Sequence, residues 1–271
     1  MSKALNLGLL AGMALATLAT ASNAQIIRPA GYDANILARN DDGSTGFVDF
    51  GLGTLNFFGQ NITGGWVNNN GNVTLDTPGN GPLSTFTPFN LITTGRAMLA
   101  PFFADVDTRD TSSGVTTYGN AQVGGRNAFF ANWENVGYYN AQAGVTNSFQ
   151  LVVIERSDRG VGDFDFCFLY DRILWETGQA SGGNPQGLGG NSARAGWSNG
   201  STNSFELNGS AINGAFLDGG PNSLAAIGNI CFVVRNGNVE PPVIPMPPAA
   251  MAGVSTMLGL AGISAFRRRR A

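Results

Sequence analysis

Three aspartates in one short stretch are the residues with the clearest potential for chemistry. The stretch DVDTRD places Asp105, Asp107 and Asp110 at the end of an apolar run. Asp105 and Asp107 would share a strand face, and such clusters can bind Ca²⁺ when carbonyl groups and another carboxylate complete roughly six to eight oxygen ligands. The spacing is not that of an EF-hand. The alternative is structural: Arg109 or Arg172 pairs with one carboxylate while another caps a turn.

Paired carboxylates could also hydrolyse a glycosidic bond, the one catalytic scheme that the residue types leave open. Glu134, Glu155, Asp171 and Glu176 could supply a pair, although nothing in their spacing brings two of them together. The chain has no His, and Lys3 is its one lysine. Catalytic triads, Cys-His pairs and His-ligated zinc are thereby excluded, as is Schiff-base chemistry once Lys3 is removed. We expect a protein that is not an enzyme and needs no cofactor other than possible calcium.

Cys167 and Cys231 lie in the apolar, strand-like runs FDFCFLYD and NICFVVRN. In an exported protein they predict one disulfide, which would contribute roughly 4 kcal/mol in the chain-entropy model. Two buried free thiols are the alternative. A thiol nucleophile is not expected in either case.

The N-terminus predicts export. Residues 1–24 combine a basic residue, a short apolar run and small residues, which is typical of a secretory signal peptide cleaved after Ala24. Near the other end, residues 249–266 carry no charge and as a helix would span roughly 27 Å, close to the thickness of a bilayer core. Residues 267–271 would then remain in the cytoplasm, because four consecutive arginines follow the helix: Arg267, Arg268, Arg269 and Arg270.

A proline-rich linker at 241–248 precedes this helix, and its prolines prevent helix or central strand. Linker, helix and arginines together resemble the PEP-CTERM class of bacterial sorting tails, over roughly residues 241–271. Met246 between Pro245 and Pro247 stands where Glu is usual in that class. The resemblance implies processing by an exosortase-like membrane enzyme, and an ordinary membrane anchor is the alternative.

The elements that position these residues are predicted to be strands. Short apolar or alternating runs recur between turn signals, and 39 glycines support frequent tight turns. Asn70-Gly71 is a strong hairpin signal. Four aromatic residues share one strand face that we expect to line the core: Phe164, Phe166, Phe168 and Tyr170. We predict an all-β fold over 25–240, an antiparallel β-sandwich of many short strands, with an N-terminal signal helix and a C-terminal transmembrane helix.

Six motifs follow one another in the order and approximate spacing of a known domain. They are FFG, WVNNNGNVTL, APFFADVDTR, NSFQLVVIER, FLYDRILWETG and ARAGWSNG. This order resembles the NIDO domain, an extracellular nidogen-like module that also occurs in bacterial surface proteins, from about Asn40 to Gly237. The resemblance implies an adhesive or matrix-associated role and carries no catalytic residues over.

Charge and location narrow the range of partners. Residues 25–240 hold all 18 acidic residues but only 10 of the 15 basic ones, so this part of the chain would repel nucleic acid. We expect an exported protein of the cell surface, outer membrane or extracellular matrix after transient inner-membrane anchoring, with a non-enzymatic adhesive or structural role and polysaccharide or matrix proteins as partners. The alternatives are a carbohydrate-active hydrolase and a lectin-like glycan binder. A glycan could contact Arg172 and Trp175, unless Trp175 is a core residue.

Overall fold

The computed structural model describes residues 26–242 of the 271-residue chain. The predicted signal peptide with its cleavage site after Ala24 lies outside the described residues. The same holds for the predicted sorting and anchoring residues of the tail: Pro245, Pro247, 249–266, Arg267, Arg268, Arg269 and Arg270. Within residues 26–242, no helix is both long and apolar enough to cross a bilayer.

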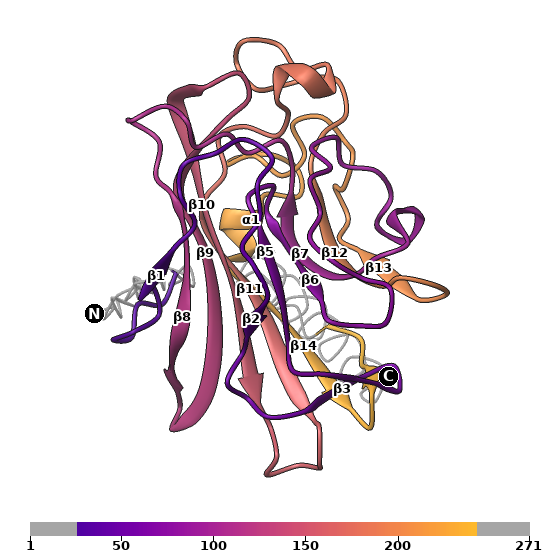
Figure 1. The fold of residues 1–271 in the computed structure, drawn as a ribbon. Coiled ribbons are helices and arrows are strands. Elements are labelled where there is room, and N and C mark those ends of the chain that lie inside the picture. Colours follow the sequence, from indigo (N-terminus) through magenta and orange to yellow (C-terminus); the bar gives the residue numbers. More distant parts are fainter. Residues whose placement is uncertain (1–25, 243–271) are drawn as a thin grey trace, which may run out of the picture.

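The larger of two main sheets has seven strands in the order β1-β8-β9-β10-β11-β14-β15, and every neighbouring pair is antiparallel (Figure 1). Its strands are β1 (Asn35–Ile36), β8 (Thr116–Val123), β9 (Arg126–Tyr138), β10 (Gln142–Glu155), β11 (Phe164–Arg172), β14 (Asn229–Arg235) and β15 (Asn238–Val239). The sequence predicts short strands throughout. β9 has 13 residues and β10 has 14, so the prediction is wrong for the length of these two strands.

The smaller sheet has six strands in the order β13-β12-β7-β6-β5-β2. Its strands are β2 (Val48–Asp49), β5 (Gly64–Asn68), β6 (Asn72–Leu75), β7 (Ala97–Phe103), β12 (Arg194–Asn199) and β13 (Ser204–Glu206). A separate hairpin joins β3 (Leu55–Phe57) to β4 (Gln60–Ile62), and the helical turns are η1 (Leu91–Thr94), η2 (Gln179–Ser181) and α1 (Leu224–Ile227). The described residues are therefore all-β and antiparallel, as predicted.

Aromatic side chains from both main sheets pack against each other to form the core. Phe102 of β7 lies 5.2 Å from Phe149 of β10, measured between ring centroids, and Phe149 stacks on Trp133 of β9. All three side chains are fully buried. Removing such large apolar surfaces from water is the main stabilising contribution, and it holds the sheets face to face as a sandwich.

Loops cover the outer face of the smaller sheet at β7. Leu83 and Leu91, from the segment between β6 and β7, pack with Met98 and Phe103 on that side. All seven residues of β7 are consequently buried. This explains why its sequence reads as one continuous apolar run rather than as an alternation of apolar and polar residues.

β11 confirms the predicted aromatic face, and its opposite face carries the disulfide. The core-facing residues are fully buried: Phe164, Phe166, Phe168 and Tyr170. Cys167 points the other way and lies directly opposite Cys231 of β14 in the strand register. The two sulfur atoms are bonded at 2.04 Å, as predicted for the only two cysteines of the chain.

The predicted hairpin at Asn70-Gly71 joins β5 to β6. Gly71 adopts φ +75°, a left-handed conformation that favours glycine. A β-carbon at this position would also lie 1.8 Å from the carbonyl oxygen of Phe102. The hairpin tip therefore approaches β7 so closely that no side chain fits, and this contact brings the neighbouring asparagines to the end of β7.

Candidate functional site

Three acidic side chains meet beyond the end of β7. Asp41 and Asp42 lie in the loop between β1 and β2, and Asp105 follows β7. One carboxylate oxygen from each of them lies within 4.8 Å of the other two. Asp105 is only 1% exposed, whereas Asp41 and Asp42 are half-buried. We call these three residues the acidic cluster.

Asn69, in the tip of the β5–β6 hairpin, holds the parts of the acidic cluster in place. Its Nδ2 donates to the carbonyl oxygen of Asp41 at 2.6 Å and to that of Val106 at 2.7 Å. The carbonyl oxygen of Asn69 accepts a hydrogen bond from Nε1 of the core residue Trp133 at 3.0 Å. The hairpin, anchored in the core, thus fixes the loop that carries Asp41 against the segment that follows β7.

Two carboxylate oxygens of the acidic cluster are buried without a hydrogen-bond partner among residues 26–242, namely Oδ1 of Asp41 and Oδ2 of Asp105. Oδ1 of the neighbouring Asn70 is in the same condition, while its Nδ2 donates to Oδ1 of Asp42 at 2.9 Å. A buried polar atom that lacks a partner costs about 1–3 kcal/mol. The fold therefore maintains a group of unsatisfied oxygen acceptors at this place.

Burial and repulsion from neighbouring carboxylates make ionisation of Asp105 and Asp41 unfavourable. Burial raises the pKa of Asp105 to about 7, and the negative charges of Asp41, Asp42 and Asp107 add to the effect. The pKa of Asp41 is raised to about 6, again by burial first and then by Asp107 and Asp42. The positive charge of Arg109 opposes both shifts without cancelling them.

Arg109 is engaged mainly by Asp107. Its Nε donates to Oδ1 of Asp107 at 2.9 Å and its Nη2 to Oδ2 at 2.5 Å, and the N–H of Ala141 adds a bond of 2.8 Å to Oδ2. Burial raises the pKa of Asp107, but these hydrogen bonds more than offset it and hold the pKa below its usual value. Nη2 of Arg109 also lies 3.1 Å from Oδ2 of Asp41.

The structure separates the three aspartates of DVDTRD. Asp105 belongs to the acidic cluster, whereas Asp107 forms the ion pair with Arg109 that the structural alternative anticipated. Asp110 lies in a turn, where its Oδ1 accepts the N–H of Ser112 at 2.7 Å. Asp107 and Asp110 are thus not brought together with Asp105 as a set of ligands.

This separation has a backbone cause. β7 ends at Phe103, and the N–H of Val106 donates to the carbonyl oxygen of Ala104 at 2.9 Å, which turns the chain. The strand alternation that would place Asp105 and Asp107 on one face therefore stops before Asp105. Sequence reasoning missed Asp41 and Asp42, because the doublet before Gly43 reads only as a turn signal, and it assigned Asn70 only to a hairpin.

The acids considered for a hydrolytic pair each have separate surroundings. Glu134 pairs with Arg28 and accepts from the hydroxyl of Tyr32. Glu155 accepts the N–H of Ser157, and Asp171 is exposed at the end of β11. Glu176 is 1% exposed and its two carboxylate oxygens accept backbone N–H groups from two residues: Gly214 at 2.5 Å and Phe216 at 2.7 Å.

The segment proposed as a glycan-contacting surface is mostly interior. Trp175 is fully buried, with its ring 5.7 Å from that of Phe102 and its Nε1 donating to the carbonyl oxygen of Val136 at 3.1 Å. Arg172 donates to the carbonyl oxygen of Thr146 at 3.1 Å. Trp175 is therefore a core residue, in agreement with the structural alternative.

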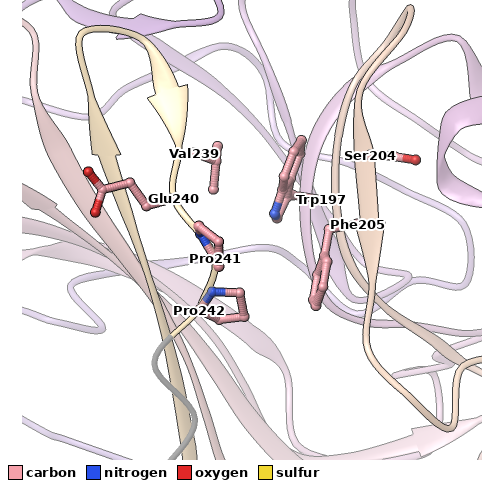
Figure 2. A pocket seen from close by; sticks show the side chains of 7 residues that line it. All are labelled: Trp197, Ser204, Phe205, Val239, Glu240, Pro241 and Pro242. Carbon is pink, nitrogen blue, oxygen red and sulfur yellow. The ribbon is translucent and has the colours of Figure 1, made fainter.

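An apolar hollow of about 260 Å³ lies where the described chain ends (Figure 2). Trp197 of β12 and Phe205 of β13 line one side, and Pro241 and Pro242 line the other. Glu240 is its one ionisable lining residue, and Figure 2 shows the carboxylate turned away from Trp197. One carboxylate does not make the pair that glycoside hydrolysis requires.

The acidic cluster is the part of residues 26–242 where three potential metal-ligating side chains meet. Its donors are carboxylate oxygens together with the amide oxygen of Asn70, which suit a hard cation. Oxygen donors gathered in this way are suited to binding such an ion.

Comparison with known proteins shows the family to which the sandwich domain belongs. Residues 63–218, more than half of the chain, match the nidogen-like domain (NIDO) family. The matched region runs from the hairpin that holds Asn69 to the loop that follows Phe216, and so includes Asp105 but not Asp41 or Asp42. No solved structure matches the chain.

Alpha-tectorins are among the similar curated proteins. Alpha-tectorin of Mus musculus is 36% identical over 199 residues, and that of Homo sapiens is 35% identical over 199 residues; each alignment covers 63% of this chain. Alpha-tectorin of Gallus gallus is 33% identical over 187 residues, or 61% of this chain. The chain spans only 8% of the length of these relatives. Because the family match covers more than half of the chain, the chain belongs to the nidogen-like domain family.

Proposed function

We propose that this chain is an exported protein whose nidogen-like domain acts outside the cytoplasm in a non-enzymatic structural or adhesive role. The observation that carries the proposal is the family match over residues 63–218, together with the similarity to alpha-tectorins. The sequence motifs resemble those of an extracellular nidogen-like module, which supports a location outside the cytoplasm. A rigid sandwich with a buried aromatic core suits a module that presents surfaces rather than one that closes around a substrate.

The disulfide supports an extracytoplasmic location. Cys167 and Cys231 are the two cysteines of the chain and are bonded to each other. Such structural disulfides persist in oxidising compartments and are rare in the cytosol. The predicted signal peptide at 1–24 would deliver the chain to such a compartment.

The environments of the acidic side chains support a non-enzymatic role. Retaining and inverting glycosidases both need two carboxyl groups that flank one bond. Glu176 is buried and held by backbone N–H groups, and Glu134 is held by Arg28 and Tyr32. These contacts account for the carboxylates of Glu134 and Glu176 as parts of the fold.

Sorting through the C-terminal tail completes the proposal. The linker at 241–248, the apolar segment at 249–266 and the arginines at 267–270 would hold the chain in the inner membrane until an exosortase-like enzyme releases it to the cell surface or to a polysaccharide-rich matrix. Pro241 and Pro242 already line the surface hollow beside Trp197. The sorting tail would thus begin directly at the surface of the sandwich.

The experiment follows the full-length chain in a bacterium that encodes an exosortase. A chain lacking residues 241–271 is compared with the intact chain, and mass spectrometry of the mature protein reports both ends and the disulfide. We expect cleavage after Ala24, loss of the tail, one disulfide and recovery with the cell surface or matrix, whereas the truncated chain should be released into the medium. Firm cell association of the truncated chain contradicts sorting by the tail. An uncleaved, reduced chain in the cytosol contradicts the extracellular role itself.

Adhesion is tested on the same cells. Cells that display the intact chain should retain more matrix polysaccharide than cells that carry the truncated chain, and the purified chain should release no sugar from that polysaccharide. Sugar release by the purified native chain would instead favour the hydrolase, and saturable binding of one glycan on an array would favour the lectin-like binder.

A further inference from the structure

The acidic cluster has the spacing of a calcium site. One oxygen each from Asp41, Asp42 and Asp105 lies within 4.8 Å of the other two. Two oxygens bound to the same Ca²⁺ at about 2.3–2.6 Å are at most about 5 Å apart. The three carboxylates are therefore spaced as ligands of one ion. We propose that Asp41, Asp42 and Asp105, with Asn70 as a fourth ligand, bind one Ca²⁺ ion.

Asn70 is independent support for a bound cation. Asn70 is only 1% exposed, and its Oδ1 has no hydrogen-bond partner among the described residues. The bond from Nδ2 to Oδ1 of Asp42 places this amide group beside the acidic cluster. Amide oxygens are common ligands of Ca²⁺. A cation would satisfy Oδ1 of Asn70 together with Oδ1 of Asp41 and Oδ2 of Asp105, which otherwise stay unpaired.

The local charge balance calls for a further cation. Asp107 and the acidic cluster place four carboxylates near the single guanidinium of Arg109, which Asp107 binds through two nitrogens. Arg39, the other nearby arginine, donates instead to the carbonyl oxygens of a turn, including those of Thr108 and Ser113. Buried charges require compensating partners. A divalent ion would supply the positive charge that Arg109 does not.

The donor types select the ion. The chain has no His, and both cysteines are in the disulfide, so the nitrogen and sulfur ligands preferred by zinc and copper are lacking. Mg²⁺ demands near-ideal octahedral geometry and usually keeps several waters, with one or two carboxylates. Three carboxylates and an amide from three segments of the chain match Ca²⁺, which accepts a flexible arrangement of oxygen ligands.

The ion would join three segments of the fold. It would connect the loop between β1 and β2, which carries Asp41 and Asp42, to the β5–β6 hairpin at Asn70 and to the segment after β7 at Asp105. We therefore expect calcium to stabilise the native chain, since a ligand that binds only the folded state raises its stability. This site does not depend on the extracellular role, because it follows from the side-chain geometry alone.

The test uses the purified full-length chain, stripped with EDTA and then titrated with CaCl₂ by isothermal titration calorimetry. Thermal unfolding is followed in parallel by circular dichroism, in EDTA and in calcium. We expect one calcium per chain and a midpoint about 5–10 °C higher when free calcium is about one hundred times Kd. MgCl₂ serves as the competing ion and should bind at least about tenfold more weakly.

Three variants distinguish a calcium site from a structural cluster. Asp42→Asn, at a half-buried position, should weaken calcium binding by at least about tenfold. Asp105→Asn should abolish the calcium-induced increase in the midpoint, yet raise the midpoint in EDTA because it removes one of the repelling charges. Asp110→Asn is the matched control from the same motif and should bind calcium like the native chain.

Several results would overturn the proposal. They are the absence of calcium binding in the native chain, equal affinities of the Asp42→Asn and Asp110→Asn variants, and Mg²⁺ binding as tight as that of Ca²⁺. If Asp105→Asn does not fold, the comparison of Asp42→Asn with Asp110→Asn decides the question alone.

Discussion

The backbone of Gly178 lies directly against the carboxylate of Asp105, so that a β-carbon added to Gly178 would stand 2.3 Å from Oδ2. Gly178 has φ −76°, which any residue can adopt. Space, and not backbone conformation, therefore requires glycine here. The segment that leads into η2 closes one side of the acidic cluster, and the oxygen that it approaches is the one without a hydrogen-bond partner.

A methyl group at position 178 should displace the carboxylate of Asp105. We expect Gly178→Ala to lower the free energy of unfolding by about 1–3 kcal/mol, in the range of overpacked sites, and to weaken calcium binding. Urea denaturation and calorimetry measure the two effects. Gly144→Ala is the matched control, because nothing lies within 4 Å of a β-carbon built there. Equal stability of the two variants would show that the contact with Asp105 is not tight.

Removing the disulfide should destabilise the sandwich strongly. Cys167 and Cys231 are 64 residues apart in sequence, and the chain-entropy model gives about 4 kcal/mol for a loop of this length. The double variant Cys167→Ala/Cys231→Ala should lose about that amount in urea denaturation, and the native chain with its disulfide reduced should behave alike. A loss below about 1 kcal/mol would mean that pairing of β11 with β14 already restricts the unfolded chain.

Glu176 should prove structural rather than catalytic. Its two oxygens accept the N–H groups of Gly214 and Phe216, so the amide group of Gln would point a donor at one of these donors. We expect Glu176→Gln to lower the free energy of unfolding by roughly 1–3 kcal/mol. Glu155→Gln, at a half-buried position with one bond to the N–H of Ser157, should change it by less than about 0.5 kcal/mol. Denaturant titration that ranks the two variants equally would contradict this role.

Tyr32 should make stability depend on alkaline pH. Burial raises the pKa of Tyr32 to about 12, and its hydrogen bond to the charged carboxylate of Glu134 adds to the shift, as does the charge of Asp33, while Arg28 opposes it. A folded-state pKa above the ordinary value of 10 favours the protonated phenol in the native state. The resulting stability is complete below pH 10 and is lost as the pH rises toward 12.

The measurement compares the native chain with Tyr32→Phe in urea at pH 8 and at about pH 11. The native chain should lose more stability between these values than the variant, and ultraviolet absorbance should show one more late-ionising tyrosine in the native chain than in the variant, because burial also raises the pKa of Tyr138 and Tyr170. Equal losses of stability in the two chains would contradict a raised pKa of Tyr32 in the native state.

Local patterns predicted the parts of the fold that depend on neighbours in sequence. Strand alternation placed Phe164 and Tyr170 on one buried face and Cys167 on the other, because the period of two is a property of any strand. Asn70-Gly71 marked the hairpin, because only a few residues tolerate φ above zero. The motif NSFQLVVIER, apart from its last residue, lies in β10, but this strand begins five residues earlier than the motif, at the polar Gln142.

The candidate site escaped such patterns. The motif DVDTRD singled out the correct region, yet strand alternation assigned Asp107 to the same face as Asp105, and the chain turns at Val106 instead. Nothing near Asp41 in the sequence points to Asp105, because the β5–β6 hairpin, through Asn69, joins the loop that carries Asp41 to the segment after β7.

The sequence by itself determined the all-β class, the family, the aromatic core face and the paired cysteines, since each depends on residue type and short-range periodicity. The tertiary structure alone decided which carboxylates share a site. Asp107 and Asp105 are two residues apart, but one is neutralised by Arg109 and the other faces Asp41 and Asp42. Electrostatic interactions depend on distance in space and on burial, and for these residues both are set by contacts between segments far apart along the chain.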